Sequence, residues 1–438
     1  MFERPQQGER AVLVHIRFQR EQQGASPEEQ LAEFAELVAS TGAKQVGLVT
    51  GKKVAPDPRL FVGSGKAEEV RDLVKASEAD VVIFDHALSP SQERNLESFL
   101  QCRVLDRTGL ILDIFAQRAR SHEGKLQVEL AQLQHLSTRL VRGWTHLERQ
   151  KGGIGMRGPG EKQLETDRRL LAERIKSIRK RLERVKQQRE QGRQLRKKAN
   201  IPTISLVGYT NAGKSTLFNA LSGASVYAAD QLFATLDPTL RRVILPDNQS
   251  VVLADTVGFI RQLPHDLVAA FRATLQETEE ADLLLHVIDA SDPERNSYID
   301  QVNNVLEEIG AADSPQVLVY NKIDLTDAQA RSLPAQDGLP ARVWVSAKTG
   351  AGLSELLEVI AQQFARDTMR GRLLLPMDAG QLRAELFERG AVLHEELTPE
   401  GQWALDVSLS RRSFGQLAGR FKAVDFDVLT RLACEAEP

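Results

Sequence analysis

The sequence predicts a three-domain α/β protein that carries a long helical hairpin. Short β-branched runs alternate with amphipathic helical patterns over the first hundred residues and again after residue 200. Such alternation is typical of parallel sheets covered by helices. Between these regions, leucine and isoleucine recur every three or four residues over two long stretches, as expected of packed helices. A length of 438 residues also suits about three domains.

Residues 1–120 are predicted to form the first domain, a small parallel α/β unit. Its strands are expected at 11–18, 45–50, 80–85 and 103–106, and its helices at 26–40, 66–76 and 89–100. The Gly63–Lys66 segment precedes a helix and suits an anion at the helix N-terminus. Leu60, however, stands where a Walker A motif has its first glycine. We therefore favour an ordinary strand-to-helix turn over a second nucleotide site.

Residues 121–199 are predicted to form an antiparallel helical hairpin. Apolar residues at helical spacing mark both arms; they are Leu126, Leu130, Leu133, Leu136, Leu140, Trp144 and Leu147 in the first and Leu164, Leu171, Ile175, Ile178, Leu182 and Val185 in the second. Two such seams bury each other when the helices pack side by side. At 1.5 Å per residue the second arm would reach roughly 50 Å, beyond a compact body.

The hairpin has a basic character and a glycine-rich tip at 151–163. The span 139–198 holds 20 basic and 7 acidic residues, so it carries a formal charge of +13 while the rest of the chain carries −16. Glycines allow close backbone approach, and cations attract phosphate. We favour an RNA-contacting loop over a flexible connector for the tip. The basic helix alone does not decide between nucleic-acid contact and a solvated face.

Composition narrows the setting of the protein. Its two cysteines, Cys102 and Cys434, are too few for a disulfide framework or a four-cysteine zinc site. The first ten residues lack the apolar stretch of a signal peptide, and no apolar run approaches 18 residues. These features predict a cytoplasmic protein that does not span a membrane.

Residues 200–368 are predicted to form a P-loop domain. The apolar run 202–207 is followed by Gly208-Tyr-Thr-Asn-Ala-Gly-Lys-Ser215, which opens a helix. This is the GxxxxGK[ST] motif between the strand and the helix that it requires. Its backbone amides cradle phosphates, Lys214 neutralises the β- and γ-phosphates, and Ser215 is a ligand of Mg²⁺.

Two further segments suit the γ-phosphate and the metal ion. In the segment 233–237, Thr235 has the better spacing to complete the Mg²⁺ shell and sense the γ-phosphate as part of a switch loop; Thr239 is the fallback. Asp255 ends an apolar run and suits a Walker B carboxylate that holds Mg²⁺ through water, and the Gly258 amide can reach the γ-phosphate. The predicted catalytic residues are therefore Lys214, Thr235 and Gly258.

The motif Asn321-Lys-Ile-Asp324 follows another apolar strand and suits recognition of a guanine base. The Asp324 carboxylate can accept from two donors of guanine that adenine does not offer as a pair, while Asn321 holds the purine and joins the loop to the P-loop. The Lys322 stem covers the ring, and a backbone amide in 346–348 can reach O6. These contacts predict GTP rather than ATP.

The predicted nucleotide-binding residues form five short groups. They are Gly208, Tyr209, Thr210, Asn211, Ala212, Gly213, Lys214, Ser215 and Thr216; Phe233, Ala234, Thr235, Leu236 and Asp237; Asp255, Thr256, Val257 and Gly258; Asn321, Lys322, Ile323 and Asp324; and Ser346, Ala347 and Lys348.

The ordered set GYTNAGKS, FATLD, DTVG, NKID and SAK resembles the five G motifs of translation-factor-related P-loop GTPases. Together with the preceding α/β domain, the hairpin and the segment KGGIGMRGPGEKQLETDRR, the chain resembles HflX-type GTPases over essentially its whole length. The resemblance implies a cytosolic GTPase that binds the large (50S) ribosomal subunit and its RNA and splits or rescues stalled 70S ribosomes, often under heat stress. It also implies that Ser215 and Thr235 are ligands of Mg²⁺.

One departure from the Ras-like pattern bears on mechanism. Phe259 stands where those enzymes carry the glutamine that orients the attacking water. A phenyl ring cannot do this, so we expect slow intrinsic hydrolysis that a partner, such as the ribosome, accelerates. Similar hydrophobic replacements occur in the family that the chain resembles.

Residues 369–438 are predicted to form a small α+β domain with the order β-α-β-β-α and without evident site chemistry. We expect a monomer that binds GTP and GDP. Two alternatives to ribosome splitting stay open: a GTPase that assembles the large subunit, and a nucleotide-dependent regulator of a membrane protease, which would involve peripheral membrane association.

Overall fold

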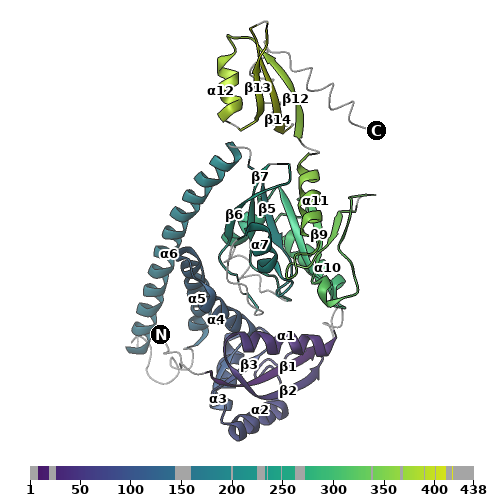
Figure 1. Ribbon diagram of the computed structural model, residues 1–438. Coiled ribbons are helices and arrows are strands. Elements are labelled where there is room, and N and C mark those ends of the chain that lie inside the picture. Colours follow the sequence, from purple (N-terminus) through teal and green to yellow (C-terminus); the bar gives the residue numbers. More distant parts are fainter. Residues whose placement is uncertain are drawn as a thin grey trace.

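The computed structural model describes residues 8–18, 26–143, 159–198, 201–223, 232–233, 235–247, 249–261, 272–336, 339–365, 368–388, 390–399, 401–410 and 417. Over this part of the chain the strands form three separate sheets. Figure 1 shows the three sheets one above another, with a long helix along one side. The α/β fold class predicted from the sequence is confirmed.

The first sheet consists of four parallel strands in the order β2-β1-β3-β4. The strands are β1 (Arg10–Phe18), β2 (Lys44–Lys53), β3 (Val81–Phe84) and β4 (Arg103–Leu105), and the helices are α1 (Pro27–Ser40), α2 (Ser64–Ser77), α3 (Pro90–Leu100) and α4 (Arg107–Arg118). Ser26 and Ser89 form capping boxes before a proline at the first turn of α1 and α3. Both helices thus begin where the local sequence favours a start.

The two faces of this sheet have different neighbours. On the face that carries α2 and α3, the described members of the apolar core all come from the first hundred or so positions, such as Val12, Val82 and Leu96. The face that carries α1 and α4 also packs Phe233 and Val257, which lie more than a hundred residues further along the chain. One face of the first sheet is therefore completed by loops of the second.

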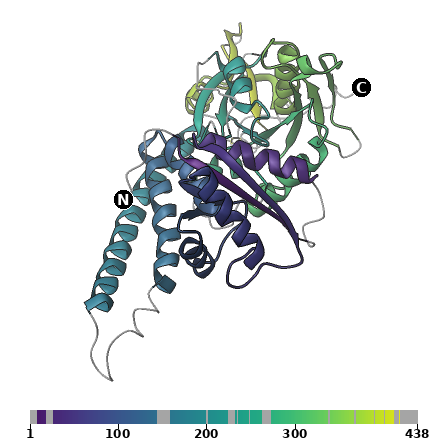
Figure 2. The ribbon, with the colours of Figure 1, turned by 90° about the horizontal axis from the view of Figure 1, so that it is seen from below.

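The hairpin consists of α5 (His122–Gly143) and α6 (Pro159–Lys198). Arg189 pairs with Glu123 at 2.8 Å and Arg174 with Glu129 at 2.6 Å, so α6 runs antiparallel to α5. Figure 2 shows the two helices side by side, extending away from the body. At 1.5 Å per residue, the 40 residues of α6 span about 60 Å.

The predicted hairpin seam is confirmed in part. Ile178 is fully buried against Leu126 and Leu130. Leu136, expected on the same seam, is 46% exposed. The tip was predicted as a loop over 151–163, but 159–163 form the first turn of α6, because the fixed φ of Pro159 suits that position. Residues 151–158 lie outside the described residues.

The second sheet has seven strands in the order β10-β11-β9-β8-β5-β7-β6. Its strands are β5 (Thr203–Val207), β6 (Thr239–Ile244), β7 (Ser250–Asp255), β8 (Leu283–Asp289), β9 (Gln316–Asn321), β10 (Arg331–Leu333) and β11 (Ala341–Trp344). The helices around it are α7 (Lys214–Ser222), α9 (Arg272–Glu279), α10 (Arg295–Glu308) and α11 (Leu353–Ala365), and a short 3-10 helix, η2, spans Ile323–Leu325. The five central strands are parallel and the two edge strands antiparallel.

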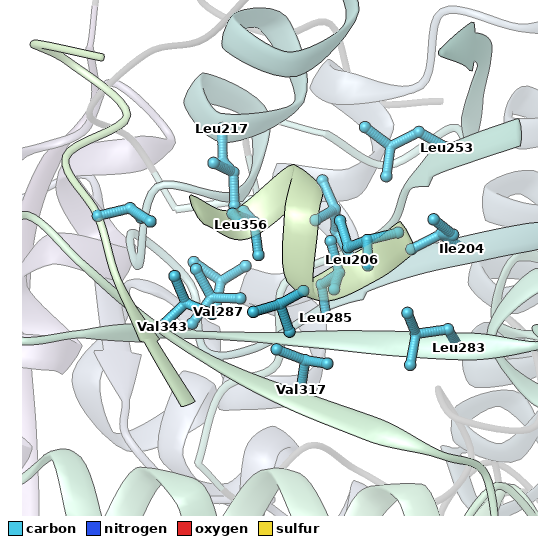
Figure 3. Packing of buried hydrophobic residues seen from close by; sticks show 14 of the residues in the cluster. Ile204, Leu206, Leu217, Leu253, Leu283, Leu285, Val287, Val317, Val343 and Leu356 are labelled. Atoms are coloured by element: carbon cyan, nitrogen blue, oxygen red, sulfur yellow. The ribbon is translucent and has the colours of Figure 1, made fainter. Parts of the chain in front are cut away.

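One face of this sheet carries a continuous apolar core. Figure 3 shows Leu206, Leu285 and Val317 of three adjacent strands beneath Leu217 of α7 and Leu356 of α11. Branched side chains buried on both faces are typical of the centre of a parallel sheet. The carboxyl ends of β5, β7, β8 and β9 meet at one edge of the sheet, where loops gather polar side chains.

The third sheet is antiparallel, in the order β12-β14-β13. It contains β12 (Thr368–Leu375), α12 (Gly380–Glu388), β13 (Val392–Leu397) and β14 (Trp403–Ser410), which is the predicted β-α-β-β order. Of the helix expected near 413–421, only Leu417 belongs to the described residues, and it is buried. Among the helices described, none has the length and apolarity needed to cross a membrane.

His286 in β8 gives the fold a specific pH dependence. Burial lowers the pKa of this imidazole from 6.5 to about 4. The unfolded chain therefore binds a proton between these values that the folded chain does not, so stability is lost as pH falls through this window. We expect His286 to contribute about 3 kcal/mol of this loss.

The measurement is urea unfolding from pH 8 to pH 4 of the native protein, His286→Gln and, as the control, His394→Gln, which alters an exposed histidine of β13. Between pH 6.5 and 4 the native protein and the control should lose about 3 kcal/mol more than His286→Gln. Equal losses in all three proteins would show that His286 does not resist protonation.

Candidate nucleotide site

The P-loop connects β5 to α7 and brings a buried lysine to the start of the helix. The Lys214 ammonium donates to the carbonyl oxygens of Gly208 at 3.0 Å and Tyr209 at 2.6 Å. Its burial lowers the pKa of the amine to about 8. An anion beside this group would favour its charged form. The charged lysine would in turn stabilise a phosphate bound in this loop.

Two glycines allow the close approaches in this loop. A Cβ on Gly213 would lie 2.3 Å from the amide nitrogen of Asn321, and its φ is +90°. A Cβ on Gly258 would lie 2.9 Å from Nζ of Lys214. Only glycine leaves room at these positions, and the backbone at Gly258 thus lies beside the lysine.

Three oxygen-bearing side chains converge next to Lys214. Oγ of Ser215 lies 2.8 Å from Oγ1 of Thr235, and both hydroxyls donate to Oδ2 of Asp255, at 2.8 and 2.9 Å. Oδ1 of Asp255 is buried and has no hydrogen-bond partner among the described residues, and burial raises the pKa of this carboxyl. Hydroxyl and carboxylate oxygens are ligands that Mg²⁺ prefers, so the donor set fits this ion. The fallback residue, Thr239, begins β6 opposite Asp255.

Asn321 and Asp324 are oriented at the far end of the pocket. The Asn321 amide donates to the carbonyl oxygen of Ala212 at 2.9 Å and accepts from the amide of Ala347 at 2.9 Å. It therefore joins its own loop to the P-loop, as the sequence suggested, and also to the loop that carries Ala347. Oδ1 of Asp324 accepts from the Ser346 hydroxyl at 2.6 Å, which leaves Oδ2 of this exposed residue for a ligand.

These groups surround a cavity of about 620 Å³. The predicted residues that line it are Thr210, Asn211, Gly213, Lys214, Ser215, Thr216, Phe233, Thr235, Thr256, Gly258, Asn321, Lys322, Asp324, Ala347 and Lys348. Glu36 of α1 and Leu325 also line it, and sequence reasoning missed both. Glu36 belongs to α1, which covers the first sheet, and lies far from the other lining residues in the sequence. No local sequence motif therefore predicts its position.

Several predicted residues lie around the cavity without lining it. They are Gly208, Tyr209, Ala212, Leu236, Asp237, Asp255, Val257, Ile323 and Ser346. Leu236 and Val257 are buried in the core of the first sheet, and the Asp237 carboxylate contacts the start of α5. Ala234 is outside the described residues.

Phe259, the residue in place of a water-orienting glutamine, points away from the cavity. It is 2% exposed and packs with Leu275, Leu284 and Val302. Its ring therefore cannot contribute to hydrolysis, and any group that orients the attacking water must come from elsewhere.

A buried polar cluster joins the P-loop to the first sheet. The Tyr209 hydroxyl donates to Oε2 of Glu33 in α1 at 2.5 Å and accepts from the amide of Arg261 at 2.8 Å. Arg107 of α4 donates to Oε1 of Glu33 at 2.8 Å and to the carbonyl oxygen of Arg261 at 2.9 Å. It also pairs with Asp85 at the end of β3. These contacts connect both loops of the site to one buried guanidinium.

Comparison with known proteins identifies the chain. Residues 28–116 match the family described as GTP-binding GTPase N-terminal, 118–196 the GTP-binding GTPase middle region, and 203–322 the 50S ribosome-binding GTPase family. The chain is 60% identical to the GTPase HflX of Escherichia coli (strain K12) over 410 residues, which are 93% of this chain and 95% of that protein. The chain belongs to the HflX family of GTPases.

A second HflX protein and one crystal structure are also similar to this chain. The GTPase HflX of Caldanaerobacter subterraneus subsp. tengcongensis is 47% identical over 395 residues, or 90% of this chain and 89% of that one. A crystal structure of a GTP-binding protein from Sulfolobus solfataricus in complex with GDP matches with a TM-score of 0.43 and 24% identity, covering 81% of this chain and 98% of that chain. The sequence matches confirm the predicted HflX resemblance, and this member of the family is a GTPase.

Asp324→Asn tests how this HflX protein selects its base. The amide offers a donor where guanine also donates, so GTP should bind about 10- to 100-fold more weakly, in line with about 1–3 kcal/mol for a bidentate base contact. Xanthosine triphosphate, which accepts at that position, should bind better. The measurement is a competition titration with both nucleotides. Asp327→Asn, an exposed carboxylate two residues beyond η2, is the control, and unchanged GTP selectivity in Asp324→Asn would contradict the assignment.

Proposed function

We propose that this HflX-family GTPase binds Mg²⁺ and GTP in the cavity described above and uses its hairpin to bind RNA of the large (50S) ribosomal subunit. Binding in the triphosphate state would split or rescue stalled 70S ribosomes, and hydrolysis would release the protein. The match of 203–322 to a 50S ribosome-binding GTPase family supports the partner. A cytoplasmic monomer is part of the same proposal.

The site residues take the roles expected from their motifs. Ser215 and Thr235 are proposed as direct ligands of Mg²⁺ and Asp255 as a carboxylate that holds the ion through water. Mg²⁺ would screen the phosphate charge during transfer. Lys214, Thr235 and the Gly258 amide are the proposed catalytic groups around the γ-phosphate. The convergence of three oxygen donors beside a buried lysine supports these roles.

The same proposal divides the chain into an α/β domain at 1–120, a hairpin at 121–199, a GTPase domain at 200–368 and a small α+β domain at 369–438. The three separate sheets among the described residues support this division. The Gly63–Lys66 turn contributes no second nucleotide site to it.

The observation that carries the RNA proposal is a row of exposed cations on α6. Within the described residues, six of them are exposed and have no ion pair; they are Lys176, Arg179, Lys180, Arg181, Arg184 and Lys186. Cations that are not already paired can replace the counterions of RNA phosphates. The helix that carries them extends beyond the body (Figure 2).

The function is tested by mixing purified 70S ribosomes with the protein and GTP, GDP or a non-hydrolysable analogue. We expect GTP and the analogue, but not GDP, to yield free subunits. Binding only to immature large subunits would favour an assembly role instead. Association with membrane vesicles and not with ribosomes would favour a protease regulator.

The RNA contact predicts a salt dependence that can be assigned to single residues. Co-sedimentation with 50S subunits should weaken about 10³- to 10⁵-fold between 50 and 200 mM salt if 6–10 phosphates are contacted. Lys180→Gln should reduce the slope of log affinity against log salt by about 1. Lys75→Gln, which alters an exposed lysine of α2, is the control. An unchanged slope for Lys180→Gln would remove this residue from the interface.

A further inference from the structure

Asp237 lies outside the nucleotide cavity, and its carboxylate binds the start of the hairpin. Oδ2 accepts from the backbone amides of Arg120 and Ser121 at 2.9 and 2.7 Å, and Oδ1 accepts from the Ser121 hydroxyl at 2.6 Å. A Cβ on Gly124 would lie 2.0 Å from Oδ1, so the glycine leaves room for the approach. The Ser121 hydroxyl in turn accepts from the Gly124 amide at 2.8 Å and so caps α5. A side chain 116 residues away in the sequence thus holds the residue that caps this helix.

The position of Asp237 ties this contact to the oxygen-bearing side chains beside Lys214. Thr235, two residues earlier, contacts Ser215 and Asp255. Two residues of extended chain span at most about 7 Å. The intervening Leu236 is 1% exposed and packs in the core of the first sheet. This packing limits how far Thr235 and Asp237 can move relative to each other. Thr235 therefore cannot withdraw far without moving the carboxylate that holds α5.

The other end of the hairpin base is attached to a different part of the GTPase sheet. Arg193 of α6 pairs with Glu280 at 2.6 Å, and Arg196 pairs with Glu277 of α9 at 3.3 Å. Thr278 of α9 contacts Ser205 of β5 at 3.2 Å. The end of α6 is thus attached to the strand that leads into the P-loop, while the start of α5 is attached to the loop that carries Thr235.

The two arms are also joined to each other at this base. Glu123 in the first turn of α5 pairs with Arg189 of α6 at 2.8 Å and accepts from Gln127 at 3.0 Å. The two helices therefore move together. A shift of the α5 attachment relative to the α6 attachment would change the direction in which the whole hairpin points.

We propose that Asp237 is the positioning residue that couples the Thr235 loop to the hairpin. It holds the base of the hairpin when Thr235 engages Mg²⁺ and the triphosphate, and it releases α5 when Thr235 withdraws. This inference rests on the proposed function, since it assigns Thr235 to Mg²⁺. By linkage, a target that fixes the hairpin in the held position strengthens triphosphate binding by the same factor.

A helix cap without this coupling would behave differently. It would protect the first amides of α5 to the same degree in every nucleotide state, because capping depends only on the local hydrogen bonds. Coupling instead requires that protection depends on the γ-phosphate. Hydrogen exchange of the amides of 120–124 distinguishes a simple cap from a coupled one, since the amides of Arg120 and Ser121 donate directly to Asp237.

The experiment compares amide exchange of the full-length protein saturated with Mg²⁺ and either GDP or a non-hydrolysable GTP analogue. We expect the amides of 120–124 to exchange about 5- to 150-fold more slowly with the analogue, the usual range of coupling between two sites. In Asp237→Ala this difference should vanish. In Asp237→Asn, which keeps one acceptor oxygen, part of it should return.

Ser89→Ala is the matched control, because it removes a hydrogen-bonding cap from α3 on the far face of the first sheet. It should keep the full nucleotide dependence at 120–124. Equal exchange in both states of the native protein would overturn the inference, and so would an undiminished difference in Asp237→Ala and Asp237→Asn. The assay contains no ribosomes, so its outcome is independent of the ribosome-splitting test.

Discussion

The arrangement depends on apolar side chains that belong to both the GTPase site and the first sheet. Leu232, Phe233 and Leu236 from one loop, and Val257 and Ile260 from the other, are buried in the core formed by α1, α4, β1 and β3. The ring of Phe233 packs edge-on against Phe115 of α4, with centroids 4.7 Å apart. Burial of each such side chain stabilises by about 1.5–3 kcal/mol. Neither loop can leave the site without exposing part of that core.

The polar contacts reinforce the same constraint. Tyr209 of the P-loop donates to Glu33, Arg261 pairs with the same carboxylate at 3.8 Å, and Arg107 completes the cluster. A buried cluster of this kind destabilises the protein when one member loses its partner, so it disfavours separation of the two sheets. The hairpin, attached through Asp237 and through the end of α6, then follows the state of the site.

Sequence reasoning predicted the features that local patterns encode. The strand runs, the P-loop and the base-reading motif are each recognisable within a few residues, and so is the seam around Ile178. Helix α4 escaped prediction because Leu110, Ile111, Leu112 and Ile114 are all buried, which erases the helical periodicity. The partners of Asp237 and Tyr209 and the position of Glu36 depend on contacts between distant segments. The spacing of residues along the sequence does not predict such contacts.

The most direct test of this shared core is a double-mutant cycle of Phe115→Leu and Phe233→Leu, read out as affinity for a non-hydrolysable GTP analogue relative to GDP. The contact between the two rings should contribute about 0.5–1.5 kcal/mol to the preference for the analogue over GDP. Each single variant should therefore lower this affinity ratio about 2- to 12-fold. The double variant should lose no more than the larger single loss, because both changes remove one contact. An unchanged affinity ratio in folded Phe115→Leu, or fully additive losses, would contradict the account.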